Sequence, residues 1–105
     1  MNKIGIDLVY LPEFSKQLKT GGNKFIEKSF SLNELKNKSV EHLAGLWAAK
    51  EAVIKASDLI PNKYTDICIS YNKQGKPCAK LDSQSFNISI AHHGDYAVAV
   101  AIEDK

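Results

Sequence analysis

Arginine is absent from this chain of 105 residues, and all 14 of its basic residues are lysine. The chain therefore has no guanidinium group with which to recognise a guanine, a phosphate or a carboxylate through two parallel hydrogen bonds. Its net charge of +2 is also small for a protein that binds a nucleic-acid backbone. We expect no nucleic-acid partner, and we expect any bound phosphate to be contacted by lysine, histidine or backbone amides.

Long apolar runs and cysteines are also scarce. No stretch approaches the roughly 20 apolar residues of a membrane-spanning helix, and Asp7 interrupts the N-terminal apolar segment before it could form the core of a signal sequence. Two cysteines, Cys68 and Cys78, are too few for a disulfide-rich miniprotein, and both fall in strand-like segments. These features predict a cytoplasmic protein with buried, reduced thiols and no membrane span.

The size and composition of the chain predict a single domain covering residues 1–105. Hydrophobic residues make up 44% of the chain and charged residues 25%, which is typical of a globular protein rather than a disordered one. A chain of this length buries only slightly more than about 60% of its unfolded surface, so it has little capacity to enclose a large ligand. A sizeable site is therefore expected at an edge or between subunits.

The N-terminal third predicts one strand followed by short helices. Residues 4–11 are mostly apolar and indicate a buried strand that carries one carboxylate, Asp7. Short amphipathic helices are expected at 13–19 and 23–30, on either side of a pair of glycines. Ser31-Leu32-Asn33-Glu34 has the spacing of a capping box, in which the serine and the glutamate side chains each satisfy a free amide at a helix start.

The longest helical pattern extends from Ser39 to about Ser57 and has an alanine-rich centre. At about 100° per residue, Glu51 falls on an apolar stripe of this helix. Small and apolar residues cover most of the remaining circumference, which predicts a long central helix packed on several sides. The members of the stripe are Val40, Leu43, Ala44, Trp47, Glu51 and Ile54.

The second half of the chain changes to the alternating pattern of strands. An antiparallel sheet packed against helices gives an α+β fold class. The four expected strands cover residues 66–71, 76–81, 86–91 and 96–103, with hairpin turns expected at 72–75 and 92–95.

Two carboxylates, Asp7 and Glu51, fall among apolar neighbours. A buried carboxylate without a partner costs several kcal/mol, so each requires a lysine, donor amides or a metal ion. A buried ion pair or a half-exposed helix edge would satisfy this requirement without any function. Glu51 and Lys55, four residues apart, also have the spacing of an ordinary surface ion pair on a helix, although this helix has almost no solvated face.

The histidines and the N-terminal lysines can each be interpreted as structural or as functional residues. His92 and His93 are compatible with polar turn residues at a hairpin tip, with Asn87 and Ser89 alternating behind them, or with donors to a phosphate. A zinc site formed by Cys68, Cys78 and these histidines lacks the usual ligand spacing. The lysines of the first helices form either a solvated face or a surface for an acidic protein, and they are Lys16, Lys19, Lys24 and Lys28.

Taken in order, several segments of the chain resemble the small 4'-phosphopantetheinyl transferases of the holo-acyl-carrier-protein synthase type. The Lys-Glu-Ala-x-x-Lys-Ala core is fairly specific, and the ordered combination, which spans nearly the whole chain, is more so. The matching segments are Ile4-Gly5-Ile6-Asp7-Leu8-Val9, Phe25 through Glu34, Leu43 through Ala56, Gly75-Lys76-Pro77, Ile88-Ser89-Ile90-Ala91-His92 and Tyr96-Ala97-Val98-Ala99.

This resemblance implies a Mg²⁺-dependent enzyme that moves 4'-phosphopantetheine from coenzyme A to a serine of an apo acyl carrier protein and releases adenosine 3',5'-bisphosphate. It implies a role in fatty acid and lipid biosynthesis and a homotrimer whose sites lie at subunit interfaces. Asp7 and Glu51 would hold the metal, and Glu51 would accept the serine proton. Lys55 would lie against the phosphates. The resemblance assigns the nucleotide end of coenzyme A to Gly75, Lys76, Pro77 and His92, which would come from a neighbouring subunit.

The chain also departs from this family at several positions. Glu13 and Leu46 stand where the family often has arginine, and the first of these arginines is implied in contacting the acidic helix of the carrier. Tyr10 replaces a frequent glutamate, and Ala91 replaces a frequent serine. These departures leave a second hypothesis open: a non-catalytic relative that binds coenzyme A or a carrier protein. A small α+β module whose charges merely pair is a third.

Overall fold

The computed structural model describes residues 3–104. They fold into an α+β structure in which a five-stranded antiparallel sheet packs against helices, as the sequence predicts. The helices are α1 (Leu11–Ser29), η1 (Glu34–Lys36, 3₁₀), α2 (Val40–Ala56) and η2 (Tyr64–Asp66, 3₁₀), and the strands are β1 (Ile4–Tyr10), β2 (Cys68–Tyr71), β3 (Pro77–Leu81), β4 (Gln84–His93) and β5 (Tyr96–Asp104).

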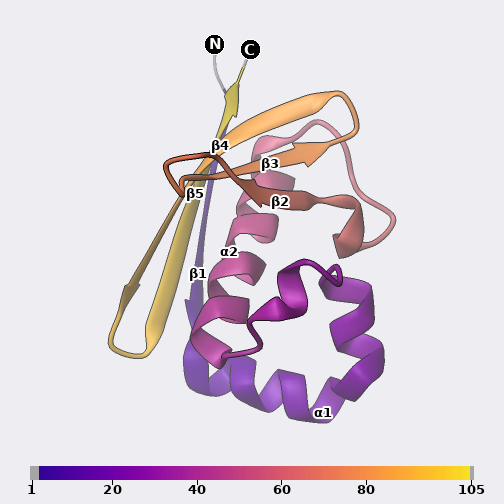
Figure 1. Cartoon of the computed structure of the whole chain (residues 1–105), viewed down its shortest axis with the longest axis vertical. Coiled ribbons are helices and arrows are strands. Elements are labelled where there is room, and N and C mark those ends of the chain that lie inside the picture. Colours follow the sequence, from indigo (N-terminus) through magenta and orange to yellow (C-terminus); the bar gives the residue numbers. More distant parts are fainter. Residues whose placement is uncertain (1–2, 105) are drawn as a thin grey trace.

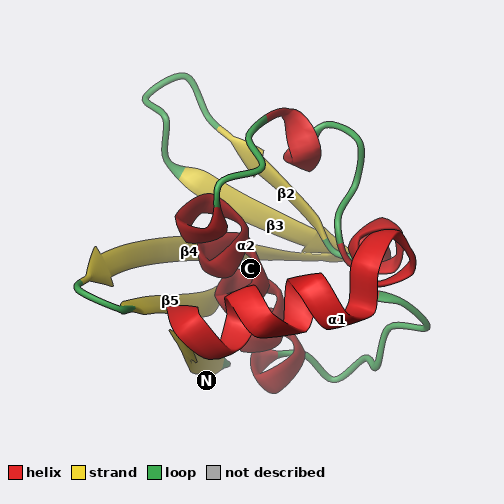
Figure 2. Cartoon of the chain, turned by 90° about the horizontal axis from the view of Figure 1, so that it is seen from below, coloured by secondary structure: helices red, strands yellow, loops and turns green. Residues whose placement is uncertain are grey.

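The strands are ordered β1-β5-β4-β3-β2, so the first strand of the chain pairs with the last. Ile4 stands opposite Ile102, and Tyr10 stands opposite Tyr96. Figure 1 shows the helices on one side of a strongly twisted sheet, with α2 running alongside β1 and β5. In Figure 2, α2 is seen nearly along its axis and α1 crosses in front of it. No helix in residues 3–104 combines the length and the apolar character needed to cross a membrane.

Small residues allow α2 to lie unusually close to the sheet. Glycine is required at position 5 of β1, because a Cβ there would collide with the backbone carbonyl of Ala52 in α2. Small side chains line both sides of this contact and are fully buried: Ala44, Ala48, Ala49 and Ala52 on α2, and Ala97, Ala99 and Ala101 on β5. The small side chains therefore bring the backbone of β1 against the middle of α2.

Trp47 joins α1 to the other side of α2. Its ring centroid lies 6.1 Å from that of Phe14 and 5.3 Å from that of Phe25, both on α1. Phe30, just after α1, lies 6.4 Å away. Aromatic pairs at these separations add to the hydrophobic contribution of burial. This cluster fixes α1 across α2.

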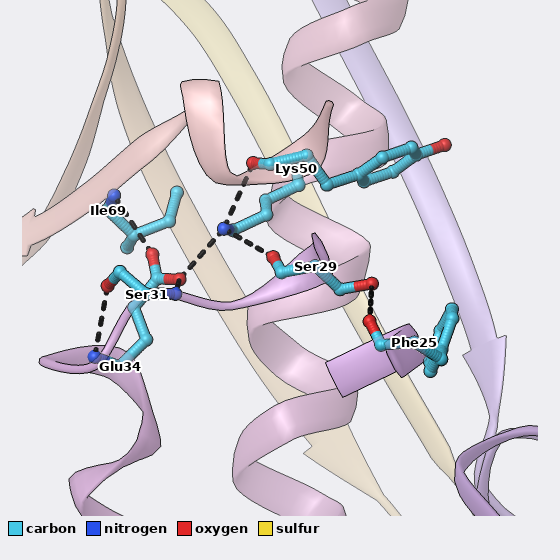
Figure 3. Close-up of polar contacts among 7 residues, drawn as sticks. Phe25, Ser29, Ser31, Glu34, Lys50 and Ile69 are labelled. Carbon is cyan, nitrogen blue, oxygen red and sulfur yellow. Dashed lines mark hydrogen bonds and ion pairs between the residues drawn. The ribbon is translucent and has the colours of Figure 1, made fainter. Parts of the chain in front are cut away.

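Lys50 of α2 is completely buried. Its ammonium group donates hydrogen bonds to the backbone carbonyl of Ser29 at 2.7 Å, to Oε1 of Glu34 at 2.8 Å and to the backbone carbonyl of Tyr64 at 3.1 Å (Figure 3). Three acceptors match the three N–H donors of an ammonium group. Desolvation lowers the pKa of Lys50, and the hydrogen bond and charge of Glu34 oppose that shift.

Glu34 extends this contact to further segments. Its Oε1 accepts a hydrogen bond from the amide of Ser31 at 2.9 Å, and the hydroxyl of Ser31 accepts one from the amide of Glu34 at 3.2 Å. This confirms the predicted capping box, which opens only the short helix η1. Oε2 of Glu34 also accepts from the amide of Ile69 in β2 at 3.3 Å. The pair of Lys50 and Glu34 thus joins both helices to η1, η2 and β2.

The boundaries of two predicted segments differ from the structure. The two short helices expected at 13–19 and 23–30 are present as the two parts of α1, which begins two residues earlier, at Leu11, and is interrupted at Gly22, where the backbone is not helical (φ 59°, ψ −153°). His92 and His93 were expected in a turn, yet β4 continues through both of them and the turn contains only Gly94 and Asp95. Strand alternation therefore places these histidines on opposite faces of the sheet.

The prediction of buried thiols is wrong for Cys68, which is exposed on β2, while Cys78 is half-buried on β3. Cys68 and Ser70 point to the solvent side of this edge strand, and Ile69 between them is buried. The apolar character of the segment is therefore a property of one face only. Both cysteines are free thiols.

Replacing Lys50 with methionine should lower the free energy of unfolding by about 3–5 kcal/mol, because Glu34 and two carbonyls would lose their buried donor. Urea denaturation of Lys50→Met and of the matched Lys38→Met variant measures this loss. Lys38 is exposed, so its replacement should change stability by no more than about 0.5 kcal/mol. Equal losses in the two variants would contradict the structural role of the buried ammonium group.

Candidate active site

A polar cavity of about 320 Å³ lies where the end of β1, the start of α1 and the middle of α2 meet. Asp7 and Glu51 both line it, together with Glu13 and the ring of Trp47. The predicted pair of carboxylates therefore faces one cavity, although the two residues are far apart in the sequence. The close contact of Gly5 with α2 places Asp7 beside the helix that carries Glu51.

Lys55 binds Asp7 rather than Glu51. Its ammonium group donates to Oδ1 of Asp7 at 3.2 Å and to the backbone carbonyl of Ile6 at 2.9 Å. The Lys55 side chain is 54% exposed and the Asp7 side chain 17%. A surface ion pair along the helix between Glu51 and Lys55 is thus not formed. Lys55 remains accessible to an anionic group that enters from solvent.

Glu51 is bound by Tyr64 of η2, a residue that no pattern in the sequence points to. The phenol of Tyr64 donates to Oε1 of Glu51 at 2.8 Å. Its ring stacks on Trp47, with a centroid distance of 4.4 Å and an interplanar angle of 7°. Desolvation first, and then the hydrogen bond and charge of Glu51, raise the pKa of Tyr64 to about 12.

The donor set of this cavity fits a hard divalent cation. No cluster of three or more His, Cys, Asp or Glu side chains suited to a metal occurs within residues 3–104, so a complete protein cage such as zinc requires is not found there. Mg²⁺ is usually bound by only one or two carboxylates, with water and substrate phosphates as its other ligands. Asp7 and Glu51 meet that requirement.

A second cavity, of about 560 Å³, lies between the first turns of α2 and strands β3 and β4. Of the residues assigned to nucleotide binding, Lys76, Pro77 and His92 line it. Gly75 lies in the adjoining turn, where its φ of 82° favours glycine. Nε2 of His92 lies 2.9 Å from the backbone carbonyl of Glu41 and donates to it. These residues therefore gather at one place, apart from the carboxylates.

The residues lining this second cavity include lysine and histidine but no carboxylate, so it favours an anion. His42 of α2 is one of these residues, and the sequence analysis did not single it out. Its position three residues before Gly45 places it on the helix face next to β4, because Gly45 lies close to the ring of His92. Leu46, at a position where the resembled family often has arginine, lines the same cavity.

Comparison with known proteins matches residues 3–101 to the 4'-phosphopantetheinyl transferase superfamily. Holo-[acyl-carrier-protein] synthase of Corynebacterium efficiens is 34% identical, over 97% of this chain and 93% of that protein. The crystal structure of Helicobacter pylori holo-[acyl-carrier-protein] synthase in complex with coenzyme A has a TM-score of 0.83 and 32% identity, covering 96% of this chain and 99% of that one. A Bacillus anthracis holo-(acyl-carrier-protein) synthase in complex with CoA (3',5'-ADP) has a TM-score of 0.81 and 30% identity, covering 96% and 94%.

The contact between Tyr64 and Glu51 predicts an unusual tyrosine titration. In metal-free protein, Tyr64→Phe should remove an ionisation step near pH 12 from the ultraviolet difference titration. Because the folded-state pKa is above the 10.0 of an unperturbed tyrosine, the stability that Tyr64 contributes is complete below about pH 10 and is lost as the pH rises toward 12. Circular dichroism must show that the fold persists over this range. Loss of a step near pH 10 instead of near pH 12 in the variant would mean that the Tyr64 phenol is not held in this desolvated, hydrogen-bonded position.

Proposed function

Because the chain belongs to the 4'-phosphopantetheinyl transferase superfamily, we propose that it is a holo-[acyl-carrier-protein] synthase. It transfers 4'-phosphopantetheine from coenzyme A to a serine hydroxyl of an apo acyl carrier protein and releases adenosine 3',5'-bisphosphate. The observation that carries this proposal is the arrangement of Asp7 and Glu51 in one cavity with Lys55 bound to Asp7. Pyrophosphate chemistry needs this combination of carboxylates and a cation.

In this mechanism Glu51 accepts the proton of the carrier serine, directly or through a water molecule. The serine oxygen attacks the phosphorus that carries the pantetheine arm. The new serine O–P bond forms as the pyrophosphate P–O bond breaks, and the bridging oxygen departs on adenosine 3',5'-bisphosphate. Lys55 stabilises or protonates this leaving oxygen. Asp7 and Glu51 are the residues that would hold Mg²⁺, which when bound neutralises charge on the pyrophosphate oxygens.

The second cavity is proposed to bind the nucleotide end of coenzyme A. Lys76 and His92 supply positive charge or hydrogen-bond donors for its phosphates, and Gly75 and Pro77 shape the adjoining turn. Leu46 supplies no charge to this cavity. His42, one turn earlier on α2, adds a second imidazole to its lining. This arrangement provides for an anion without any arginine.

The outer face of the sheet supports the proposed trimer. Apolar side chains of β1 and β5 are exposed there, and monomeric proteins rarely leave contiguous apolar surfaces of this kind uncovered. A neighbouring subunit on this face would also bring a second cavity toward the carboxylates of the first chain. The exposed side chains are Ile4, Ile6, Leu8 and Tyr10 on β1, and Tyr96 and Ile102 on β5.

Recognition of the carrier is proposed to involve α1. Lys16, Lys19, Lys24 and Lys28 are exposed on this helix, where they can attract an acidic carrier over a distance of about one Debye length. Glu13 lines the carboxylate cavity instead of supplying the arginine that the family often has there. As a whole, the chain is proposed to act as one domain, in the cytoplasm, in the synthesis of fatty acids and other lipids.

Glu51→Gln should abolish transfer, with a loss of at least about 100-fold, because the amide neither accepts the serine proton nor binds a cation as a carboxylate does. The assay incubates the protein with coenzyme A, Mg²⁺ and candidate apo carriers and then measures the intact mass of each carrier. Asp82→Asn is the matched control, since Asp82 is an exposed turn residue with a φ of 53°, which asparagine also tolerates. Full turnover by Glu51→Gln would contradict the assignment of the site.

The same assay separates the enzyme from a non-catalytic relative, the candidate that the departures at Glu13 and Leu46 favour. If the wild-type protein binds coenzyme A but adds phosphopantetheine to none of the cognate carriers, the binding function replaces the enzymatic one. Phosphopantetheine transfer by the wild-type protein would exclude the non-catalytic binding function.

Ile6→Lys should convert the trimer to single chains, because three charges would be placed inside an apolar interface. Sedimentation equilibrium should give about three times the chain mass of 11.6 kDa for the wild type and one chain mass for the variant. Lys80→Ile, on the distant strand β3, is the reverse change on an exposed position and should leave the mass unchanged. A monomeric wild type would contradict the proposed assembly.

A further inference from the structure

Tyr64 contacts three residues of α2, namely Trp47, Lys50 and Glu51. None of these contacts follows from the family's motif as matched in this sequence. We infer that Tyr64 is a positioning residue: its neutral phenol holds one oxygen of the Glu51 carboxylate, so that the other oxygen is directed to the metal and the serine proton. This inference rests on the proposed function and goes beyond it, because it assigns Tyr64 a role that acts through Glu51.

The phenol is the only side-chain or backbone donor to Glu51 among residues 3–104, and its hydrogen bond of 2.8 Å engages Oε1. Oε2 of Glu51 accepts no hydrogen bond from residues 3–104, so it can bind a ligand. Asp7 differs, because its own Oδ1 is bound by Lys55. The two carboxylates of the cavity are therefore oriented by different donors, a phenol for one and an ammonium group for the other.

Both ends of Tyr64 are fixed by α2. The ring stacks on Trp47, which stands four residues before Glu51 on that helix and lines the same cavity. The backbone carbonyl accepts from the buried ammonium group of Lys50, the residue next to Glu51. The phenol is therefore held against the same helix turn that carries the carboxylate.

A fixed donor of this kind changes the binding properties of a carboxylate. A glutamate side chain has several rotatable bonds, and ordering it on a metal reduces its conformational freedom. A hydrogen bond that already restricts the carboxylate removes part of this loss, and removal of such partners typically weakens metal binding by 10–100-fold. An ordinary packing role for Tyr64 would involve the ring but not the hydroxyl.

The test is the variant Tyr64→Phe, which keeps the ring and removes the hydroxyl. Mn²⁺ is titrated into protein that is saturated with coenzyme A, without a carrier, and free Mn²⁺ is measured by electron paramagnetic resonance. We expect a Kd for Mn²⁺ that is about 10-fold or more higher than in the wild type, measured at a temperature at which circular dichroism shows both proteins to be folded. Thr65→Val, which removes a hydroxyl from the same short helix η2 but lines neither cavity, should leave the Kd for Mn²⁺ unchanged.

Turnover gives a second readout. The Mg²⁺ concentration for half-maximal transfer should rise about 10-fold in Tyr64→Phe, while the KM for coenzyme A stays within about twofold, a split that loss of packing would not produce. Tyr64→Leu removes the ring as well. A metal defect that appears in Tyr64→Leu but not in Tyr64→Phe would assign the effect to packing and overturn the inference.

Two failures are distinguishable. If the wild type binds Mn²⁺ and Tyr64→Phe binds it with the same Kd, only the positioning role is overturned. The transferase assignment is then unaffected. Absence of Mn²⁺ binding by the wild-type complex would overturn the positioning role and the metal site together. The carrier-mass assay decides the transferase function independently of either result.

Discussion

The buried ammonium group of Lys50 is the interaction on which the other contacts around α2 depend. Removal of a charge from water costs several kcal/mol, and here three acceptors from α1, η1 and η2 offset that cost. These acceptors lie in three segments that are distant in the sequence, and the ammonium group holds them together beside the aromatic cluster of Trp47. Tyr64 is the clearest case, since its carbonyl is bound by Lys50 and its phenol reaches the cavity of Glu51.

Residue size provides the second constraint. A helix rich in alanine and a strand with glycine at position 5 approach until their backbones touch, and this places Asp7 opposite the helix turn of Glu51. Larger residues at this contact would separate the two carboxylates and leave two surface charges without a common ligand. The chemistry of the cavity therefore depends on residues that carry no functional group.

Local patterns predicted a good part of the fold, because their interactions span only a few residues. The helix expected from Ser39 to about Ser57, the capping box of Ser31 and Glu34 and the turn at 72–75 are of this kind. The predictions of a buried thiol in residues 68–71 and of a turn at residues 92–93 were wrong. Apolar character and turn propensity do not reveal which face of a strand meets the helices or where the strand ends. The partners of Lys50 and Tyr64 could not be predicted at all. Lys50 bonds to Glu34 and Tyr64 bonds to Glu51 across 16 and 13 residues, and no periodic pattern in the sequence links residues at such separations. The convergence of Asp7 and Glu51 was predicted only through the resemblance to a family.

The pairing of the first strand with the last has a consequence for synthesis of the protein. β1 is at the edge of the sheet, where β5 is its one neighbouring strand among residues 3–104, and Asp7 stands opposite Ala99 in that ladder. On the ribosome, β1 emerges long before β5 and has no strand to pair with until β5 has been synthesised, because contacts between distant parts of a chain form late. Asp7 is thus translated early and fixed last, so a nascent or C-terminally truncated chain carries Glu51 and Lys55 without a completed site. The site is complete only after β5 has been synthesised and has paired with β1.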